Sequence, residues 1–212
     1  MDIKFDRSKH VYKSDDFEEI IKDTIRFFNG TPVHKLPPPK NFIGTGVYAL
    51  YYTGKSPYYK KLYDLNRIEF KQPIYVGKAV PRGWRQARKY RNQEDSNELY
   101  RRLCDHMKSI SQVNNLELND FHCRFMILEK AACDMIGTVE AALIRYYIPI
   151  WNNLLDGFGN HDPGKGRYNQ AKSEWDVLHP GRAWADRCNG EASSLQEVED
   201  KVRGFFNLGD DD

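Results

Sequence analysis

The sequence contains none of the long apolar segments that insertion into a membrane requires. No apolar run reaches the roughly 18 residues needed to cross a bilayer, and the first ten residues, MDIKFDRSKH, lack the apolar core of a signal peptide. We therefore expect a soluble, intracellular protein.

Cysteine is also scarce. The four cysteines, Cys104, Cys123, Cys133 and Cys188, are far apart in the sequence and form no CxxC pair. None has a histidine at the spacing of a zinc site. This pattern argues against a disulfide framework and against a zinc finger, so we expect reduced, partly buried thiols.

The sequence has almost no excess of either charge, because 32 Lys and Arg residues face 30 Asp and Glu residues, for a net charge of +2. This balance favours no class of partner. The distribution is more informative, since residues 82–91 carry five basic side chains and no acid, interleaved with Trp84 and Tyr90. Such a segment can contact a phosphate backbone; a solvated loop is an equal alternative.

The 212 residues suit one domain with elaborations, or at most two small ones. Asp15 and Glu18 can form a capping box at the start of a first amphipathic helix, which is followed by a linker with three consecutive prolines, Pro37–Pro39. Apolar periodicity predicts helices at residues 14–29, 96–111, 132–147 and 193–206, and strands at residues 42–54, 73–78 and 121–130. The order of these elements predicts an α+β fold, a small antiparallel or mixed sheet with a three-stranded core, flanked by helices.

Two of the predicted strands each combine a tyrosine with a glycine, in GVY at 46–48 and YVG at 75–77. In adjacent antiparallel strands, the hydroxyls of Tyr48 and Tyr75 can share one face. The glycines would let a substrate approach the backbone closely. An isolated tyrosine is usually a packing residue, so the neighbouring motifs decide its role.

Three further motifs carry polar side chains that suit phosphate chemistry. Arg102 and His106 lie four residues apart, on one helix face, where they can neutralise phosphate charge and transfer a proton or simply form a basic surface patch. Glu140, inside the apolar segment GTVEAALIRYY, costs desolvation energy unless it is paired or binds a cation. Asn152 follows twelve residues later, where it could also cap a turn.

Together, GVY, YVGKA, the Arg102–His106 helix and VEAALIRYYIPIWN resemble the GIY-YIG nuclease superfamily over residues 42–155. Val47 and Val76 replace the isoleucines of the family name. The resemblance implies one nuclease domain, residues 1–212. It divides into an N-terminal helical arm and linker (1–41), a catalytic core (42–155) with insertions at 53–71 and 80–96, and a C-terminal loop and helical cap (156–212).

The resemblance also implies a divalent-metal phosphodiesterase that acts on DNA, with Mg²⁺ held by Glu140 and Mn²⁺ as an alternative ion. Tyr48 would orient or deprotonate the attacking water, with either Tyr48 or His106 as the immediate proton acceptor. The implied catalytic residues are Tyr48, Tyr75, Arg102, His106, Glu140 and Asn152. The expected phosphate- and DNA-binding residues are Lys78, Arg82, Arg85, Gln86, Arg88 and Lys89.

The segments outside the core look like those of the type II restriction branch. This implies a homodimer on a palindromic site in double-stranded DNA and a cognate DNA methyltransferase in a bacterial cytoplasm. The alternative is a repair- or homing-type nicking enzyme. The helix at 14–29, with its proline linker, could contact the partner subunit or cap its own core.

The sequence also contains features of three other classes of protein. The sequences GNHD at 159–162 and DFH at 120–122 are similar to metallophosphoesterase metal motifs, but the intervening GDxxD is missing. IEFK at 68–71 contains the ExK of another nuclease superfamily, with Asp64 upstream. A non-catalytic DNA-binding module would not need an acid such as Glu140 beside phosphate.

Overall fold

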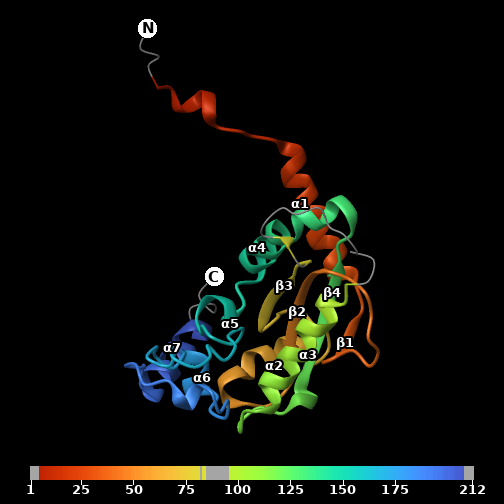
Figure 1. Cartoon of the computed structure of the whole chain (residues 1–212). Helices are drawn as coiled ribbons and strands as arrows, with labels where there is room; N and C mark the ends of the chain where they lie inside the picture. Colours follow the sequence, from red (N-terminus) through yellow and green to blue (C-terminus); the bar gives the residue numbers. More distant parts are fainter. Residues whose placement is uncertain (1–4, 82, 85–95, 208–212) are drawn as a thin grey trace.

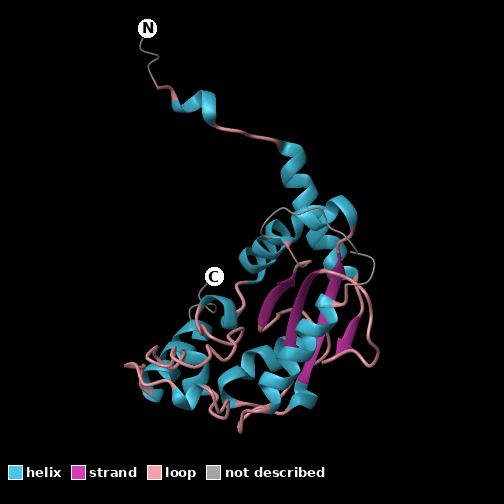
Figure 2. Cartoon of the chain, viewed as in Figure 1, coloured by secondary structure: helices cyan, strands magenta, loops and turns pink. Residues whose placement is uncertain are grey.

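The computed structural model describes residues 5–81, 83–84 and 96–207. Its centre is a four-stranded antiparallel sheet with strand order β1-β4-β2-β3 (Figures 1 and 2). The strands are β1 (Val33–Lys35), β2 (Gly46–Tyr52), β3 (Tyr75–Ala79) and β4 (Phe121–Ile127). The predicted α+β class is confirmed. The strand count is corrected from three to four, because a short strand in the predicted linker pairs with β4.

Helices surround this sheet. They are α1 (Asp15–Gly30), α2 (Lys60–Asn66), α3 (Glu98–Ser111), α4 (Ile136–Tyr147), α5 (Ile150–Asn153), α6 (Glu174–Leu178) and α7 (Leu195–Asn207). The four predicted helices are confirmed within a few residues. Two details differ. The N-cap of α1 is Ser14, whose hydroxyl accepts from the amide of Phe17, so the capping box of Asp15 does not form. The polar connection predicted at 53–71 contains α2.

The central strand β2 is buried along its whole length, because helices cover both faces of the sheet. On one face, Tyr48 and Leu50 pack with α3 residues such as Leu103. On the other face, Val47 packs with α4 residues such as Leu143. Alternate residues of a strand point to opposite faces, so the sheet has two apolar layers, and Tyr48 belongs to the layer beneath α3.

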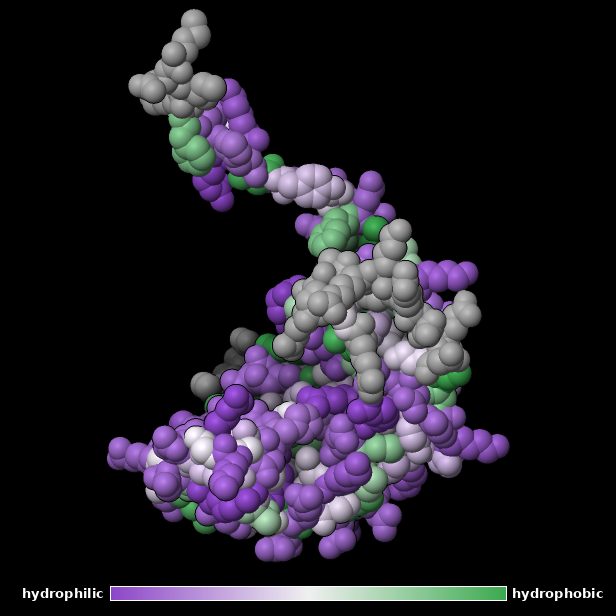
Figure 3. All heavy atoms as spheres, viewed as in Figure 1, coloured by the Kyte–Doolittle hydropathy of each residue, from purple (hydrophilic) through white to green (hydrophobic). Residues whose placement is uncertain are grey.

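The N-terminal segment projects from the body as an arm, in which α1 follows a short 3-10 helix, Arg7–His10 (Figure 1). Within α1 only Phe28 is buried. Tyr12 is 84% exposed, Phe17 49% and Phe27 63%, and apolar surface is visible along the arm (Figure 3). The apolar face of α1 is therefore covered only near its C-terminal end.

Among the residues that the structure describes, no helix combines the length and the apolar character needed to span a membrane.

Candidate active site

The register of β2 and β3 brings the two motif tyrosines together. Tyr48 lies opposite Gly77, and Leu50 lies opposite Tyr75, so both tyrosines project from the same face of the sheet. Their ring centroids are 6.3 Å apart. A Cβ atom at Gly77 would lie 2.4 Å from the Tyr48 hydroxyl. The glycine of the second motif is thus required because the Tyr48 ring end occupies the space above it.

Helix α3 adds a histidine to this pair. The Tyr48 hydroxyl oxygen lies 2.6 Å from Nε2 of His106, and the two side chains are 0% and 2% exposed. The ring of Tyr75 meets the His106 ring edge-on, with centroids 5.2 Å apart. Arg102 stands one helical turn before His106. The structure therefore brings together four of the residues predicted from the sequence.

Burial determines the protonation states in this cluster. Desolvation raises the pKa of Tyr48 well above its ordinary value of 10.0 and also raises the pKa of Tyr75, while the positive charge of Arg102 opposes both shifts. Desolvation, reinforced by the charge of Arg102, lowers the pKa of His106 well below 6.5. At neutral pH the phenol is therefore protonated and the imidazole is neutral. Tyr48 can donate its proton to Nε2 of His106.

Glu140 reaches the site from α4, which packs against the edge strand β3. One of its carboxylate oxygens lies 2.5 Å from Nζ of Lys78, and the Glu140 side chain is 18% exposed. The negative charge of Glu140 contributes to the raised pKa values of both Tyr48 and Tyr75. The Glu140 carboxylate approaches β3 from α4, and its charge still acts on Tyr48 and Tyr75.

The donor set at Glu140 suits a hydrated Mg²⁺ ion. In the part of the chain that the structure describes, no three His, Cys, Asp or Glu side chains are grouped to hold a metal ion. Mg²⁺ does not need such a group, since it retains several waters and commonly takes one or two carboxylates together with phosphate oxygens. The Glu140 side chain is 18% exposed and Lys78 contacts its Oε2, so a hydrated ion would bind the other carboxylate oxygen or displace the ammonium.

Asn152, in α5, uses both ends of its amide on strand β3. Its Oδ1 accepts from the amide of Val76 at 2.7 Å, and its Nδ2 donates to the carbonyl of Val76 at 2.8 Å. Because β3 is the edge strand, these backbone groups have no neighbouring strand on that side. Asn152 therefore completes the hydrogen bonding of β3 between Tyr75 and Gly77.

A loop after α5 supplies site residues that the sequence did not indicate. The Phe158 ring stacks on His106, with centroids 4.6 Å apart. His161 lies with Nε2 2.5 Å from a terminal nitrogen of Arg102. In the sequence, His161 belongs to GNHD, which is similar to a metal motif; in the structure it contacts Arg102. Only the fold brings this loop, more than 50 residues away in sequence, against α3.

Of the competing sequence motifs, GNHD contacts this cluster through Gly159 and His161. Glu69 of the ExK sequence pairs with Lys71, and both side chains are more than half exposed. Asp162 bonds to Arg187 at the surface, and His122 lies within β4. The predicted DNA-binding residues Arg82, Arg85, Gln86, Arg88 and Lys89 lie outside the described residues.

Comparison with known protein families agrees with this geometry. The family model described as the Eco29kI GIY-YIG domain matches residues 40–206. The match includes the tyrosine strands, α3 and α4, and extends through the loop that carries Phe158. No curated protein matches the chain.

Proposed function

The chain belongs to the Eco29kI GIY-YIG family, a restriction-endonuclease family of nucleases that act on DNA, and on that premise we propose that it is a Mg²⁺-dependent, site-specific type II endonuclease of double-stranded DNA. The observation that carries the proposal is the buried contact between Tyr48 and a neutral His106, beside Arg102 and within the electrostatic reach of Glu140. Hydrolysis of a phosphodiester requires a proton acceptor for the attacking water and positive charge on the phosphate.

The proton acceptor is a relay rather than a single group. The Tyr48 hydroxyl accepts the proton of the attacking water while it passes its own proton to Nε2 of His106. The phenol has too high a pKa to be ionised beforehand, so a neutral imidazole at hydrogen-bond distance is what makes it a competent base. Tyr75, whose ring lies next to both Tyr48 and His106, orients the water.

Positive charge at the phosphate comes from this chain and from the metal ion. Arg102 carries a permanent charge and lies beside both tyrosines, where this charge opposes the rise in their pKa values that burial causes. Mg²⁺ bound to Glu140 would stabilise the charge that develops on the phosphate oxygens. Lys78 holds the Glu140 carboxylate in place and contacts the DNA backbone. Asn152 acts as a positioning residue through the backbone of Val76.

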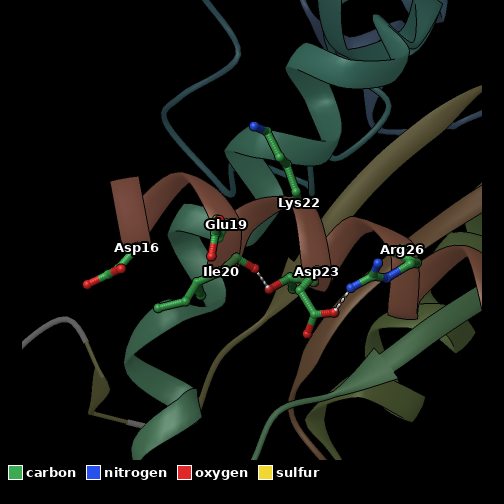
Figure 4. A pocket seen from close by; sticks show the side chains of 7 residues that line it. Asp16, Glu19, Ile20, Lys22, Asp23 and Arg26 are labelled. Atoms are coloured by element: carbon green, nitrogen blue, oxygen red, sulfur yellow. Dashed lines mark hydrogen bonds and ion pairs between the residues drawn. The ribbon is translucent and has the colours of Figure 1, made fainter. Parts of the chain in front are cut away.

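A type II enzyme that reads a palindrome needs two chains on the DNA, because each chain has one tyrosine–glutamate site. We propose that the N-terminal arm contacts the second copy. It carries exposed apolar side chains, Phe17 and Ile20 among them. Ile20 and charged residues that include Asp16 and Glu19 line an open hollow along α1, where Asp23 pairs with Arg26 (Figure 4). The expected cellular partner is a DNA methyltransferase that protects the same site in the bacterial cytoplasm.

Cleavage of a supercoiled plasmid with and without Mg²⁺ tests the proposal. We expect linear fragments with one common end sequence, formed only when the divalent ion is present. A binding module would retard the plasmid in a gel and leave it intact. A nicking enzyme would produce open circles without linear DNA, and the ends of the product would then identify the strand that is cut.

A further inference from the structure

Residues 157–161 form a loop that closes one side of the active site; we call it the cover loop. The Phe158 ring stacks on His106 and meets the Tyr75 ring edge-on at 4.9 Å. The carbonyl of Gly159 accepts from Nη2 of Arg102 at 3.4 Å, and His161 approaches the other terminal nitrogen. The cover loop therefore contacts both functional side chains of α3.

A buried arginine holds the cover loop from behind. Arg182 is 1% exposed. Its Nη1 donates to the carbonyls of Phe158 and Asn160, both at 3.2 Å, and its Nη2 donates to the carbonyl of Gly157 at 2.9 Å. Three backbone carbonyls of one loop thus converge on one guanidinium group.

The rest of that guanidinium is bound by Asp176. Nε and Nη2 of Arg182 donate to the two carboxylate oxygens of Asp176 at 2.6 and 2.7 Å. With the three carbonyls, all five N–H groups of the arginine are used. The side chain also lies over the rings of Trp175 and Trp184, at 4.5 and 4.7 Å from their centroids. The orientation of the guanidinium is therefore fixed from every side.

A buried ion pair is weak evidence for stability, because apolar residues of similar volume often replace it without loss. What apolar residues cannot replace is the set of three N–H donors that faces the loop carbonyls. A lysine cannot replace it either, since its single ammonium lacks the planar fork of the guanidinium. The chemistry of the contact points to a role in fixing the loop.

We propose that Arg182, held by Asp176, is a positioning residue for DNA cleavage because it clamps the cover loop. The cover loop in turn shields His106 from water beneath Phe158 and holds Arg102 at the phosphate position. The inference rests on the proposed function, since it assigns His106 and Arg102 to the reaction. Arg182 itself need not touch the DNA.

The first test replaces the pair with apolar residues, Arg182→Met together with Asp176→Leu. The two opposite charges are removed at once, so no buried charge is left unpaired. We expect a folded protein that is less stable than the parent, because three loop carbonyls lose their donors. Its cleavage rate should fall about 10-fold or more, because misplacement by about 1 Å can cost about 10²-fold. A folded double variant that cuts at the parent rate, with the parent pH profile, would overturn the proposal.

If the double variant does not fold, Arg182→Lys tests the same proposal. The lysine keeps a positive charge opposite Asp176, so the buried carboxylate stays paired. The same loss of kcat is expected, with KM for DNA little changed. Parent kinetics in a folded Arg182→Lys variant would contradict the clamp.

A matched pair of glycine variants tests the loop position directly. A Cβ at Gly159 would lie 3.1 Å from the Tyr75 hydroxyl and 3.6 Å from Nη2 of Arg102, whereas a Cβ at Gly204, in α7, meets nothing within 4 Å. Gly159→Ala should slow cleavage about 10-fold or more and Gly204→Ala should not. Equal rates would show that the cover loop does not border the reacting groups.

The titration of His106, followed by NMR without DNA, separates the clamp from the proposed function. The groups around this imidazole are Tyr48, Tyr75, Phe158, Arg102, His161 and Arg182. In Arg182→Lys, which keeps the positive charge that itself lowers this pKa, water reaches the ring and the pKa of His106 should rise toward 6.5. An unchanged titration contradicts the clamp even if the parent cuts DNA. A parent that cuts no DNA refutes the proposed function, while a raised pKa would still support the clamp.

Discussion

The hydroxyl of Tyr48 and Nε2 of His106 lie 2.6 Å apart with both side chains buried. Burial shifts their pKa values in opposite directions, up for the phenol and down for the imidazole. The proton therefore rests on the tyrosine, and Nε2 of the histidine accepts the hydrogen bond with its lone pair. The pair can pass a proton without carrying a buried charge at rest, which is why desolvation does not oppose the fold here.

Removal of either hydroxyl should slow cleavage while the fold is kept. Tyr48→Phe and Tyr75→Phe preserve the rings and their packing, but they remove the relay and the water-orienting group. A loss of about 10²-fold or more in kcat is expected for each, as for other positioned proton-transfer groups. Single-turnover cleavage of a DNA duplex that contains the recognition site measures this loss of rate.

Tyr146→Phe is the control, because Tyr146 is 61% exposed on α4 and has no role in the site. It should cut at the parent rate. If the Tyr48 and Tyr75 variants also match the parent, the two tyrosines are packing residues and the relay is wrong.

Loss of the Glu140 carboxylate should separate DNA cleavage from DNA binding. Glu140→Gln removes the metal ligand and also a negative charge near phosphate, so cleavage should be abolished while binding persists or tightens. Titration of Mg²⁺ in the cleavage assay should not restore activity. Glu69→Gln is the matched comparison, because Glu69 carries the ExK interpretation yet lies exposed beside Lys71. If Glu69→Gln abolished cleavage and Glu140→Gln did not, the metal ligand would be Glu69 and the ExK interpretation would be correct.

The sequence predicted the site residues whose positions follow from local periodicity. Arg102 and His106 share a face because they are one turn apart, whereas Tyr48 and Tyr75 share a face because of the register that places Leu50 opposite Tyr75. The relationship within the helix depends on a spacing of four residues, which a sequence displays directly, while the relationship between the tyrosines also depends on how the two strands pair. The position of Glu140 near β3 came only with the family resemblance.

The sequence could not predict what depends on contacts between distant segments. Strand β1 has three residues beside prolines and exists because it pairs with β4. Arg182 lies in the sequence HPGRAW, which is typical of an exposed loop, yet it is fully buried because Asp176 and three loop carbonyls satisfy its donors. No local sequence pattern predicts these hydrogen-bond partners.

The stability of the protein should decline as the pH falls below about 6.5. Burial lowers the pKa of His106 well below 6.5 and that of His179 to about 3. The unfolded chain then binds protons that the folded chain does not, so the free energy of unfolding falls by about 1.4 kcal/mol per pH unit for each histidine. The loss begins near pH 6.5 and continues toward the folded pKa values.

Urea unfolding at pH 7.5 and 5.5 measures this effect, with about 3 kcal/mol expected from the two histidines together. This window lies above the range in which carboxylates titrate. The imidazole of His179, bonded to Tyr59 and Asn115, should show no NMR titration above about pH 4. Equal unfolding free energies at the two pH values would mean that these histidines are accessible to water.

Disruption of the apolar face of the N-terminal arm should convert double-strand cleavage into nicking. Phe17 and Ile20 are 49% and 46% exposed, and lysines at both positions would place charge in the proposed contact between two copies. Sedimentation with a palindromic duplex should then show one chain per duplex instead of two, and open circles should replace linear plasmid. Ile68→Lys is the control, since Ile68 is 81% exposed but lies outside the arm.

The alternative, that α1 only caps its own subunit, predicts unchanged stoichiometry and products, because these side chains make no buried contact there. Two chains per duplex and linear product in the doubly substituted arm would therefore assign the dimer contact to another surface.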